Sequence, residues 1–272
     1  AGTATGAYRS DDGGQTWQII SPPFDVQEME RDAQGRIYLA TGSGLWSAAQ
    51  SGGAFVWQRA HGLEGVRFFS VTLNPDKQQE LWAGTWGNDI GISTDSGTRI
   101  QSLGNGLETL SVLDVLHHAT SSRISIATIE GIYQTQNNGE SWNHVPGPLS
   151  KQTVYDLYED VGDTLWAAAG DGLWSSEDVG ESWERNIQLG ATSVLRLGAV
   201  ASANGDDVLW AGTESDGLWT SLDEGQTWHH RGLQGMTVFQ LVNNPHIDEQ
   251  LIAATDRGLY ITQTTSAYSV HR

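Results

Sequence analysis

The sequence predicts an all-β repeat fold, and three observations support this. An eight-residue stretch of the form S-x-D-x-G-x-T-W recurs along the chain with small changes. A strand of the type LWAGT, followed by a turn and then GLW or GLY, occurs seven times with a spacing of 38 to 46 residues. No window shows the sustained apolar spacing of an amphipathic helix. A period in the low forties is the length of one four-stranded blade, so we expect a seven-bladed β-propeller of antiparallel blades.

The recurring stretch, here called the box, predicts a hairpin tip between the third and fourth strands of a blade. Short hydroxyl and Asp side chains bond back to nearby backbone N–H groups, and Gly supplies the positive φ of a tight turn. The Trp that ends the box begins the next strand. The boxes lie at residues 10–17, 93–100, 135–142, 176–183 and 221–228, and the second of them lacks the Trp. The predicted structural box residues are Asp12, Asp95, Asn137, Asp178 and Asp223, with Trp17, Trp142, Trp183 and Trp228.

On these stretches the chain resembles the Asp-box, or BNR, repeat families. These include sialidases, xyloglucanases, the sortilin ectodomain and the photosystem II assembly factors. The resemblance covers nearly the whole chain but concerns architecture alone, because Asp boxes mark propeller blades in proteins of very different function. It implies that the box acids shape turns on the face opposite the ligand side.

The repeat divides the chain into seven blades that we expect to form one domain of residues 1–272. The blades are predicted at approximately 1–20, 26–60, 66–103, 110–145, 154–187, 194–233 and 238–272. Their third strands are marked by Tyr8, Trp46, Ile92, Tyr133, Trp174, Trp219 and Tyr260. The first blade lacks a first strand. A cut or incomplete chain, a three-stranded blade, or a last segment that doubles back would each account for this, and the first of these is favoured.

Composition narrows the classes of partner. The chain carries 14 basic and 33 acidic residues, a net charge of −19, which argues against nucleic acid and anionic membrane surfaces. It favours basic or cationic partners. There are no cysteines and no apolar run of the roughly 20 residues that span a bilayer. The chain begins at Ala1 without a Met, which is compatible with removal of a leader and an extracytoplasmic location.

The turns between the second and third strands, here called B–C turns, hold the candidate ligand-binding residues. If strands are lettered A to D outward from the axis, the B–C turns share one face. Acids occupy five consecutive B–C turns, and we expect them to ring one mouth of the axial channel and to focus a negative field. They are Asp89, Glu130, Asp171, Glu214, Asp216 and Asp256. Trp86, in the longer B–C turn of the third blade, is a candidate for sugar stacking or for anchoring a partner. The alternative is that acids simply suit these turns and that Trp86 folds onto a neighbouring blade.

The sequence indicates no metal site, no cofactor and no assigned catalytic residue. The His pairs at 117–118 and 229–230 are sequence neighbours, so in a strand their side chains point to opposite faces. The box acids lie on separate blades and cannot converge.

The favoured function is a non-catalytic scaffold that docks a protein, with a basic segment, or another ligand such as a carbohydrate on its acidic B–C face. This is how sortilin and the photosystem assembly factors are used, although the arginine patch of the latter has no clear equivalent here. The alternative is a glycoside hydrolase of the Asp-box type, but no spacing singles out a pair of acids. A second alternative is a structural subunit of a larger complex.

Overall fold

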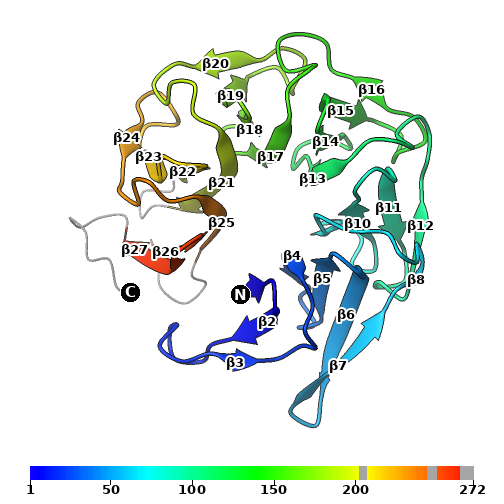
Figure 1. Ribbon diagram of the computed structural model, residues 1–272. Helices are drawn as coiled ribbons and strands as arrows, with labels where there is room; N and C mark the ends of the chain where they lie inside the picture. The colour runs from blue at the N-terminus through cyan, green and yellow to red at the C-terminus, as the bar shows by residue number, and fades with distance from the viewer. Residues whose placement is uncertain (202–206, 244–249, 264–272) are drawn as a thin grey trace. The chain divides into compact units, whose positions relative to one another are not determined.

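The described part of the chain is built entirely from β-strands and turns. The structure is a computed structural model that describes residues 1–201, 207–243 and 250–263. Within these ranges it contains 27 strands in seven sheets and no α-helix (Figure 1). The prediction of seven antiparallel blades is confirmed. Residues 264–272, the predicted end of the seventh blade, lie outside the described residues.

The chain divides into two compact units, which are described separately. Unit 1 comprises Ala1–Thr128 and Tyr133–Asn143, and unit 2 comprises Ile129–Ile132 and His144–Arg272. The boundary passes through the fourth blade. Whether the whole chain behaves as a single domain stays a prediction.

Unit 1 contains the first three blades and the inner part of the fourth. Within the described residues the first blade lacks a first strand, as predicted, and consists of β1 (Gly2–Thr3), β2 (Gly6–Arg9) and β3 (Gln18–Ile19). The second is β4 (Val26–Arg31), β5 (Ile37–Thr41), β6 (Gly44–Ser51) and β7 (Ala54–Arg59). The third runs in the order β9 (Thr72–Leu73), β10 (Leu81–Gly84), β11 (Ile90–Ser93) and β12 (Arg99–Ser102), with β8 (His61–Gly62) added in parallel outside β12.

The fourth blade is β13 (Val112–His117), β14 (Ile124–Thr128), β15 (Gly131–Thr135) and β16 (Asn143–His144). The remaining blades belong to unit 2. The fifth is β17 (Val154–Glu159), β18 (Leu165–Ala169), β19 (Gly172–Ser176) and β20 (Glu184–Asn186). The sixth is β21 (Val194–Ala201), β22 (Asp207–Thr213), β23 (Leu218–Ser221) and β24 (His229–His230). The seventh has β25 (Val238–Asn243), β26 (Gln250–Thr255) and β27 (Gly258–Gln263).

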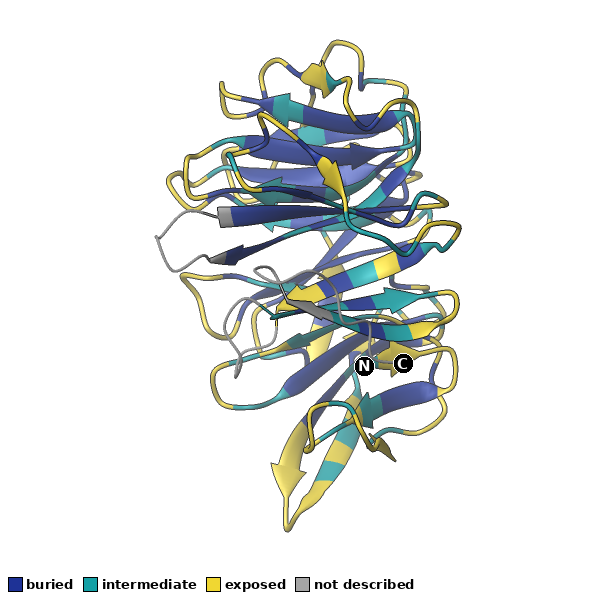
Figure 2. Cartoon of the chain, turned by 90° about the vertical axis from the view of Figure 1, so that its left-hand side faces the viewer, coloured by how far each residue is buried: buried dark blue, intermediate teal, exposed yellow. Residues whose placement is uncertain are grey.

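The second strands are the most consistently buried elements of the second to fifth blades (Figure 2). Every residue of β5, β10, β14 and β18 is buried, whereas fourth strands such as β16 are exposed. This gradient explains why second strands read as continuous apolar runs such as LWAGT, while fourth strands carry polar residues.

A bulge recurs near the start of the first strands, just before their third residue, and in two blades that residue is an acid that bonds to the following blade. The pairing register shifts between Val26 and Glu28 in β4, and at the equivalent position in β13, β17, β21 and β25. The Glu28 carboxylate then accepts a hydrogen bond from the Val71 N–H at 2.9 Å. In unit 2, Asp156 accepts one from the Leu197 N–H at 2.7 Å. These acids therefore pair one blade with the next.

A recurring apolar contact between successive blades joins an aromatic ring to a box glycine. Trp82, in the second strand of the third blade, packs against Gly139, in the box of the fourth. The Gly139 backbone has φ of +80°, and an added Cβ would lie 3.0 Å from the Trp82 ring. The same arrangement joins Tyr38 to Gly97 within unit 1 and Trp166 to Gly225 within unit 2. Gly is required here both for its positive φ and for the close approach of the ring.

An acid anchors the polar atom of each of these rings. The Trp82 Nε1–H donates to Glu80 at 3.1 Å, the Trp166 Nε1–H donates to Asp160 at 2.9 Å, and the Tyr38 hydroxyl donates to Asp32 at 3.0 Å. Burial, followed by the bond to Asp32, raises the pKa of Tyr38 to about 12. The ring is therefore fixed in orientation before the next blade packs on it.

The pairing of β10 with β11 corrects the marker residue that the sequence analysis assigned to the third strand of the third blade. The sequence placed Ile92 at the third-strand position that other blades fill with Trp or Tyr. In the structure Ala83 pairs with Gly91, whereas its counterparts Ala167 and Ala211 pair with Trp174 and Trp219. The marker position of the third blade is therefore Gly91. An added Cβ there would lie 2.7 Å from Ile100 and 3.2 Å from Leu63, so these two side chains fill the place of the ring.

We expect Gly225→Ala to destabilise the protein strongly, because the new methyl group would overlap the Trp166 ring and the residue has φ of +82°. Overpacking and the left-handed backbone together cost about 2–4 kcal/mol. The matched control is Gly235→Ala, whose φ of +74° carries the same backbone penalty but whose Cβ would meet nothing within 4 Å. Urea unfolding of both variants measures the difference. Equal losses would show that the ring contact contributes nothing.

Candidate functional site

The B–C turns of unit 2 form one continuous surface that is held together by hydrogen bonds. Three hydroxyl residues, each just before a first strand, donate to a carbonyl of the preceding blade's B–C turn: Thr153 to Ile129 at 3.5 Å, Ser193 to Gly170 at 2.9 Å and Thr237 to Glu214 at 2.6 Å. Their own carbonyls accept from the N–H groups of Gly170, Glu214 and Asp256 at 3.0, 3.0 and 3.1 Å. We call this series the turn ladder. It brings together the B–C turns of the fourth to seventh blades.

The acids of the turn ladder differ in how much of their carboxylate is engaged. Asp171 is half-buried, and its carboxylate accepts the Trp174 Nε1–H at 3.0 Å. Asp256 is exposed, accepts the Thr237 N–H at 3.1 Å and lies 3.8 Å from Arg257. Glu130 and Glu214 are exposed and Asp216 is half-buried. The carboxylates of Asp171 and Asp256 thus accept hydrogen bonds that shape the turns.

Basic side chains from the fourth strands support the same turns, and the sequence analysis missed them. His144 Nε2 bonds to the Glu130 carbonyl at 3.0 Å, and His230 Nε2 bonds to the Asp216 carbonyl at 2.8 Å. The Arg185 guanidinium donates to the Asp171 carbonyl. Each of these residues stands two positions after a box Trp, and this spacing was the signal that could have found them. They fix the turn backbone and place basic groups beside the acids.

The two remaining predicted residues belong to unit 1. Trp86 has 51% of its surface exposed, and its ring lies 5.2 Å from the Phe69 ring. Its backbone N–H donates to the Arg67 carbonyl at 3.0 Å. Asp89 is only 3% exposed; its Oδ2 accepts from the Ser102 hydroxyl at 2.5 Å, and burial raises its pKa. The structure therefore places Trp86 on the surface of a fixed loop and Asp89 inside that loop.

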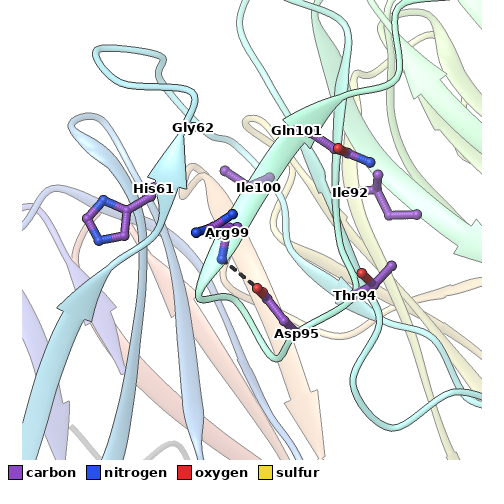
Figure 3. A pocket seen from close by; sticks show the side chains of 8 residues that line it. All are labelled: His61, Gly62, Ile92, Thr94, Asp95, Arg99, Ile100 and Gln101. Carbon is purple, nitrogen blue, oxygen red and sulfur yellow. Dashed lines mark hydrogen bonds between the residues drawn. The ribbon is translucent and has the colours of Figure 1, made fainter.

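Unit 1 also contains a cavity of about 410 Å³ beside the box that lacks its Trp (Figure 3). The buried side chains of Ile92 and Ile100 form its apolar part. Its exposed rim is formed by His61, Gly62, Thr94, Asp95, Arg99 and Gln101. The Asp95 carboxylate accepts from the Ser93 hydroxyl at 2.9 Å and the Arg99 N–H at 2.8 Å, so it is engaged in its own turn. The rim offers polar contacts to a ligand but no pair of acids.

The box acids share one local geometry. Asp178 accepts from the Ser176 hydroxyl at 2.8 Å, the Ser182 N–H at 2.8 Å and the Ser182 hydroxyl at 2.5 Å. Asp12 and Asp223 repeat these three bonds with their own neighbours, and Asn137 repeats the bond from the backbone N–H at 3.1 Å. The Trp183 Nε1–H closes the turn by donating to the Gly180 carbonyl at 3.2 Å, as Trp17 and Trp228 do in their boxes. Trp142 instead packs edge-on against Trp82, with ring centroids 6.3 Å apart.

Within the ranges 1–201, 207–243 and 250–263, no group of three or more His, Cys, Asp or Glu side chains could hold a metal ion. The same ranges contain no helix long and apolar enough to cross a membrane.

Comparisons with known proteins define the fold class first. No protein-family model matches the chain. A GH74 xyloglucanase from Xanthomonas campestris has a similar structure, with a TM-score of 0.78 at 15% identity over 98% of this chain and 50% of that one. A Ycf48 structure with a bound D1 peptide has a TM-score of 0.67 at 16% identity over 97% of this chain and 88% of that one. The chain is a β-propeller of the kind that these proteins share.

A curated relative makes the comparison more specific. The photosystem II assembly lipoprotein Ycf48 of Synechococcus sp. (strain CC9902) is 23% identical over 181 residues, or 65% of this chain. The match spans 42% of that relative's length, and a second Ycf48, from Prochlorococcus marinus (strain MIT 9313), is matched over 44% of its length. The chain thus spans less than half the length of the curated relatives it matches.

We expect the box acids to make stability depend on pH below 4. Bonds from the Ser182 side chain and backbone lower the pKa of Asp178 from 3.8 to about 2, and bonds from Thr16 do the same for Asp12. A lowered folded pKa means that the stabilisation is present above pH 4 and is lost as the pH falls toward 2. Asp178→Asn should therefore flatten the stability profile between pH 4 and pH 2.

Urea unfolding at closely spaced pH values measures this profile. Asp163→Asn, at an exposed residue outside the boxes, is the matched control and should keep the wild-type slope. An unchanged slope in the Asp178 variant would contradict the role given to its hydrogen bonds.

Proposed function

We propose that this chain is a non-catalytic protein-binding propeller that docks a partner on the turn ladder of unit 2. The observation that carries the proposal is the turn ladder itself, a surface of irregular backbone held in one conformation by hydrogen bonds between blades. A surface that is fixed before binding loses little conformational entropy when a partner docks. The similarity to Ycf48, including a structure with a bound D1 peptide, supports a protein partner.

The exposed acids suggest the chemistry of the partner. Glu130, Glu214 and Asp256 extend from the turn ladder on a chain of net charge −19. Such a surface attracts a basic segment and accelerates its encounter. The side chains of His144, Arg185 and His230 are already engaged by backbone carbonyls of the turns. We therefore propose that a basic segment of the partner contacts the carboxylates, while the fixed turn backbone provides register.

The extracytoplasmic location belongs to the same proposal. It is supported by the Ycf48 relatives, which are lipoproteins.

Glycoside hydrolysis is the second candidate, favoured by the likeness to the GH74 xyloglucanase. Two features of the turn acids favour binding over hydrolysis. The carboxylate of Asp171 is engaged by Trp174, and the raised pKa that suits a general acid belongs to Asp89, which is buried inside its own loop. A carbohydrate ligand would find its stacking surface at Trp86.

The test is peptide binding by fluorescence anisotropy, with labelled overlapping peptides that cover the D1 sequence. The first variant neutralises the turn acids with Glu130→Gln, Glu214→Gln, Asp216→Asn and Asp256→Asn. The control variant removes the same charge elsewhere in unit 2 with Glu177→Gln, Glu181→Gln, Glu184→Gln and Glu224→Gln. We expect binding by the wild type and the control, a loss of about tenfold in the first variant, and weakening at high salt as exposed charges are screened.

Two outcomes would contradict the proposal. Equal affinity of both variants would remove the acids from the binding surface. Release of sugar from xyloglucan by the wild type, lost on single replacement of Asp171 or Asp256 by Asn, would establish hydrolysis instead.

A further inference from the structure

The hairpin of β6 and β7, residues 44–59 and here called the blade-2 hairpin, departs most from the repeat. Its tip at residues 51–54 is exposed and extends beyond the neighbouring strands of unit 1 (Figures 1 and 2). It stands where other blades carry a box. Its outer strand β7 has six residues, whereas the other fourth strands of the described residues have two to four.

One edge of β7 is open along most of its length. The Ala60 N–H donates to the Leu45 carbonyl, and Gln58 and Val56 continue this pairing with β6 at every second residue. The backbone N–H and C=O groups of the alternate residues Phe55, Trp57 and Arg59 therefore point away from β6. Within the described residues, these six groups have no hydrogen-bond partner. An edge of this kind is a template for another strand.

The blade-2 hairpin lacks the usual features that keep such an edge unpaired. Residues 44–58 contain no Asp, Glu, Lys, Arg or His and no Pro, in a chain of net charge −19. Charges and Pro are the common means by which proteins block edge pairing. Val56, at 53% exposed, adds an apolar side chain on one side of the strand.

The third blade shows that such an edge accepts an added strand. There β8 pairs in parallel with β12, with His61 opposite Arg99 and Gly62 opposite Ile100. An added Cβ on Gly62 would overlap the Ile100 carbonyl, so Gly is required for this approach. Among the described residues, no segment plays the same part for β7.

We propose that β7 pairs antiparallel with β7 of a second copy of this chain. With a two-fold axis at Trp57, Phe55 of each copy faces Arg59 of the other, and all six open backbone groups of each copy are used. Val56 of each copy then faces Gln58 of the other on the opposite side. A shift of the axis to Val56 would leave Arg59 outside this set of pairs.

We propose a second copy of this chain as the partner because the open edge of β7 is complementary to itself. A two-fold interface brings the same surface together from both copies, so like charges on it would repel. Residues 44–58 of the blade-2 hairpin are uncharged on an acidic chain. The single charge on β7, Arg59, is placed opposite an aromatic ring rather than opposite its own copy. The interface does not involve the turn ladder and does not depend on the proposed function.

Sedimentation velocity over a concentration series tests the association. We expect a monomer–dimer equilibrium that strengthens with salt, because screening weakens the repulsion between two chains of net charge −19. Docking of a basic segment on the turn ladder would show the opposite salt dependence. A monomer at every concentration and salt level would overturn the proposal.

A charge pair tests the register. In Val56→Lys with Gln58→Lys, the two new lysines face each other across the interface twice, and the dissociation constant should rise about tenfold or more. In Val56→Lys with Gln58→Glu, opposite charges face each other and association should return to the wild-type level or better. Ile187→Lys with Gln234→Lys, at exposed residues of unit 2, is the control for added charge. Equal association of all three variants would exclude β7.

Cysteine cross-linking tests the same register without relying on charge. The natural chain has no cysteine, so Val56→Cys with Gln58→Cys introduces the only thiols. These positions form a non-hydrogen-bonded pair across the interface, where the Cα atoms are close enough for a disulfide. Mild oxidation should link position 56 of one copy to position 58 of the other, as read by mass spectrometry of the peptides. A link between two copies of position 56, or none, would contradict the two-fold axis at Trp57.

Discussion

The contact between an aromatic ring of one blade and a box glycine of the next is the constraint on which each unit depends. The ring of Trp82 or Trp166 reaches the next blade's box, and its Nε1–H is held by an acid of its own blade. The glycine opposite has a positive φ and no room for a side chain. An aromatic ring, the acid that bonds to it and the glycine of the next box thus hold two adjacent blades together. This agrees with the sequence, in which all five boxes keep the Gly while one lacks the Asp and another lacks the Trp.

The ring–glycine contacts between blades do not involve the B–C turns, so the sequence of these turns can vary. In unit 2 the hydrogen bonds of the turn ladder hold the turns in place instead. A hydroxyl residue before the first strand bonds to the turn of the blade before it and receives a bond from the turn of its own blade. Basic side chains of the fourth strands hold the same turns from the outside. The side chains of the turns contribute little to packing, so acids can be carried there at low cost to stability.

Much of the fold could be predicted from the sequence because its strongest signals are local. Box spacing, strand length and turn residues specify blades without reference to distant contacts. The register of the third blade could not be obtained in this way. The longer turn before β11 shifted the apparent marker to Ile92, and only strand pairing places Gly91 opposite Ala83. Leu63, which fills the space of the missing ring, comes from the segment after β8 and not from β11.

The candidate site was harder to predict for a related reason. The spacing of acids in the B–C turns located the turns but not the direction of each carboxylate. Asp89 was grouped with its counterparts only because it stands in a B–C turn, yet bonds to Ser102 and Gly104 hold it inside the loop. The supporting residues His144, Arg185 and His230 belong to fourth strands. Their spacing from the box Trp marks a shared position, but it does not show that their side chains reach the turn. Such contacts depend on the pairing of third and fourth strands, which sequence periodicity does not resolve.

The departures from the repeat are concentrated in the second and third blades. The second has lost its box and gained the blade-2 hairpin; the third has lost the box Trp and the ring at Gly91, and has gained β8, the cavity and the exposed Trp86. A repeat that packs each blade by the same contacts tolerates such losses only where other side chains replace them, as Leu63 and Ile100 do here. These features all lie in unit 1, whereas the turn ladder lies in unit 2. The sequence of one repeat has therefore diverged in two ways, through its outer edge in unit 1 and through its turns in unit 2, and the two proposed surfaces have no residue in common.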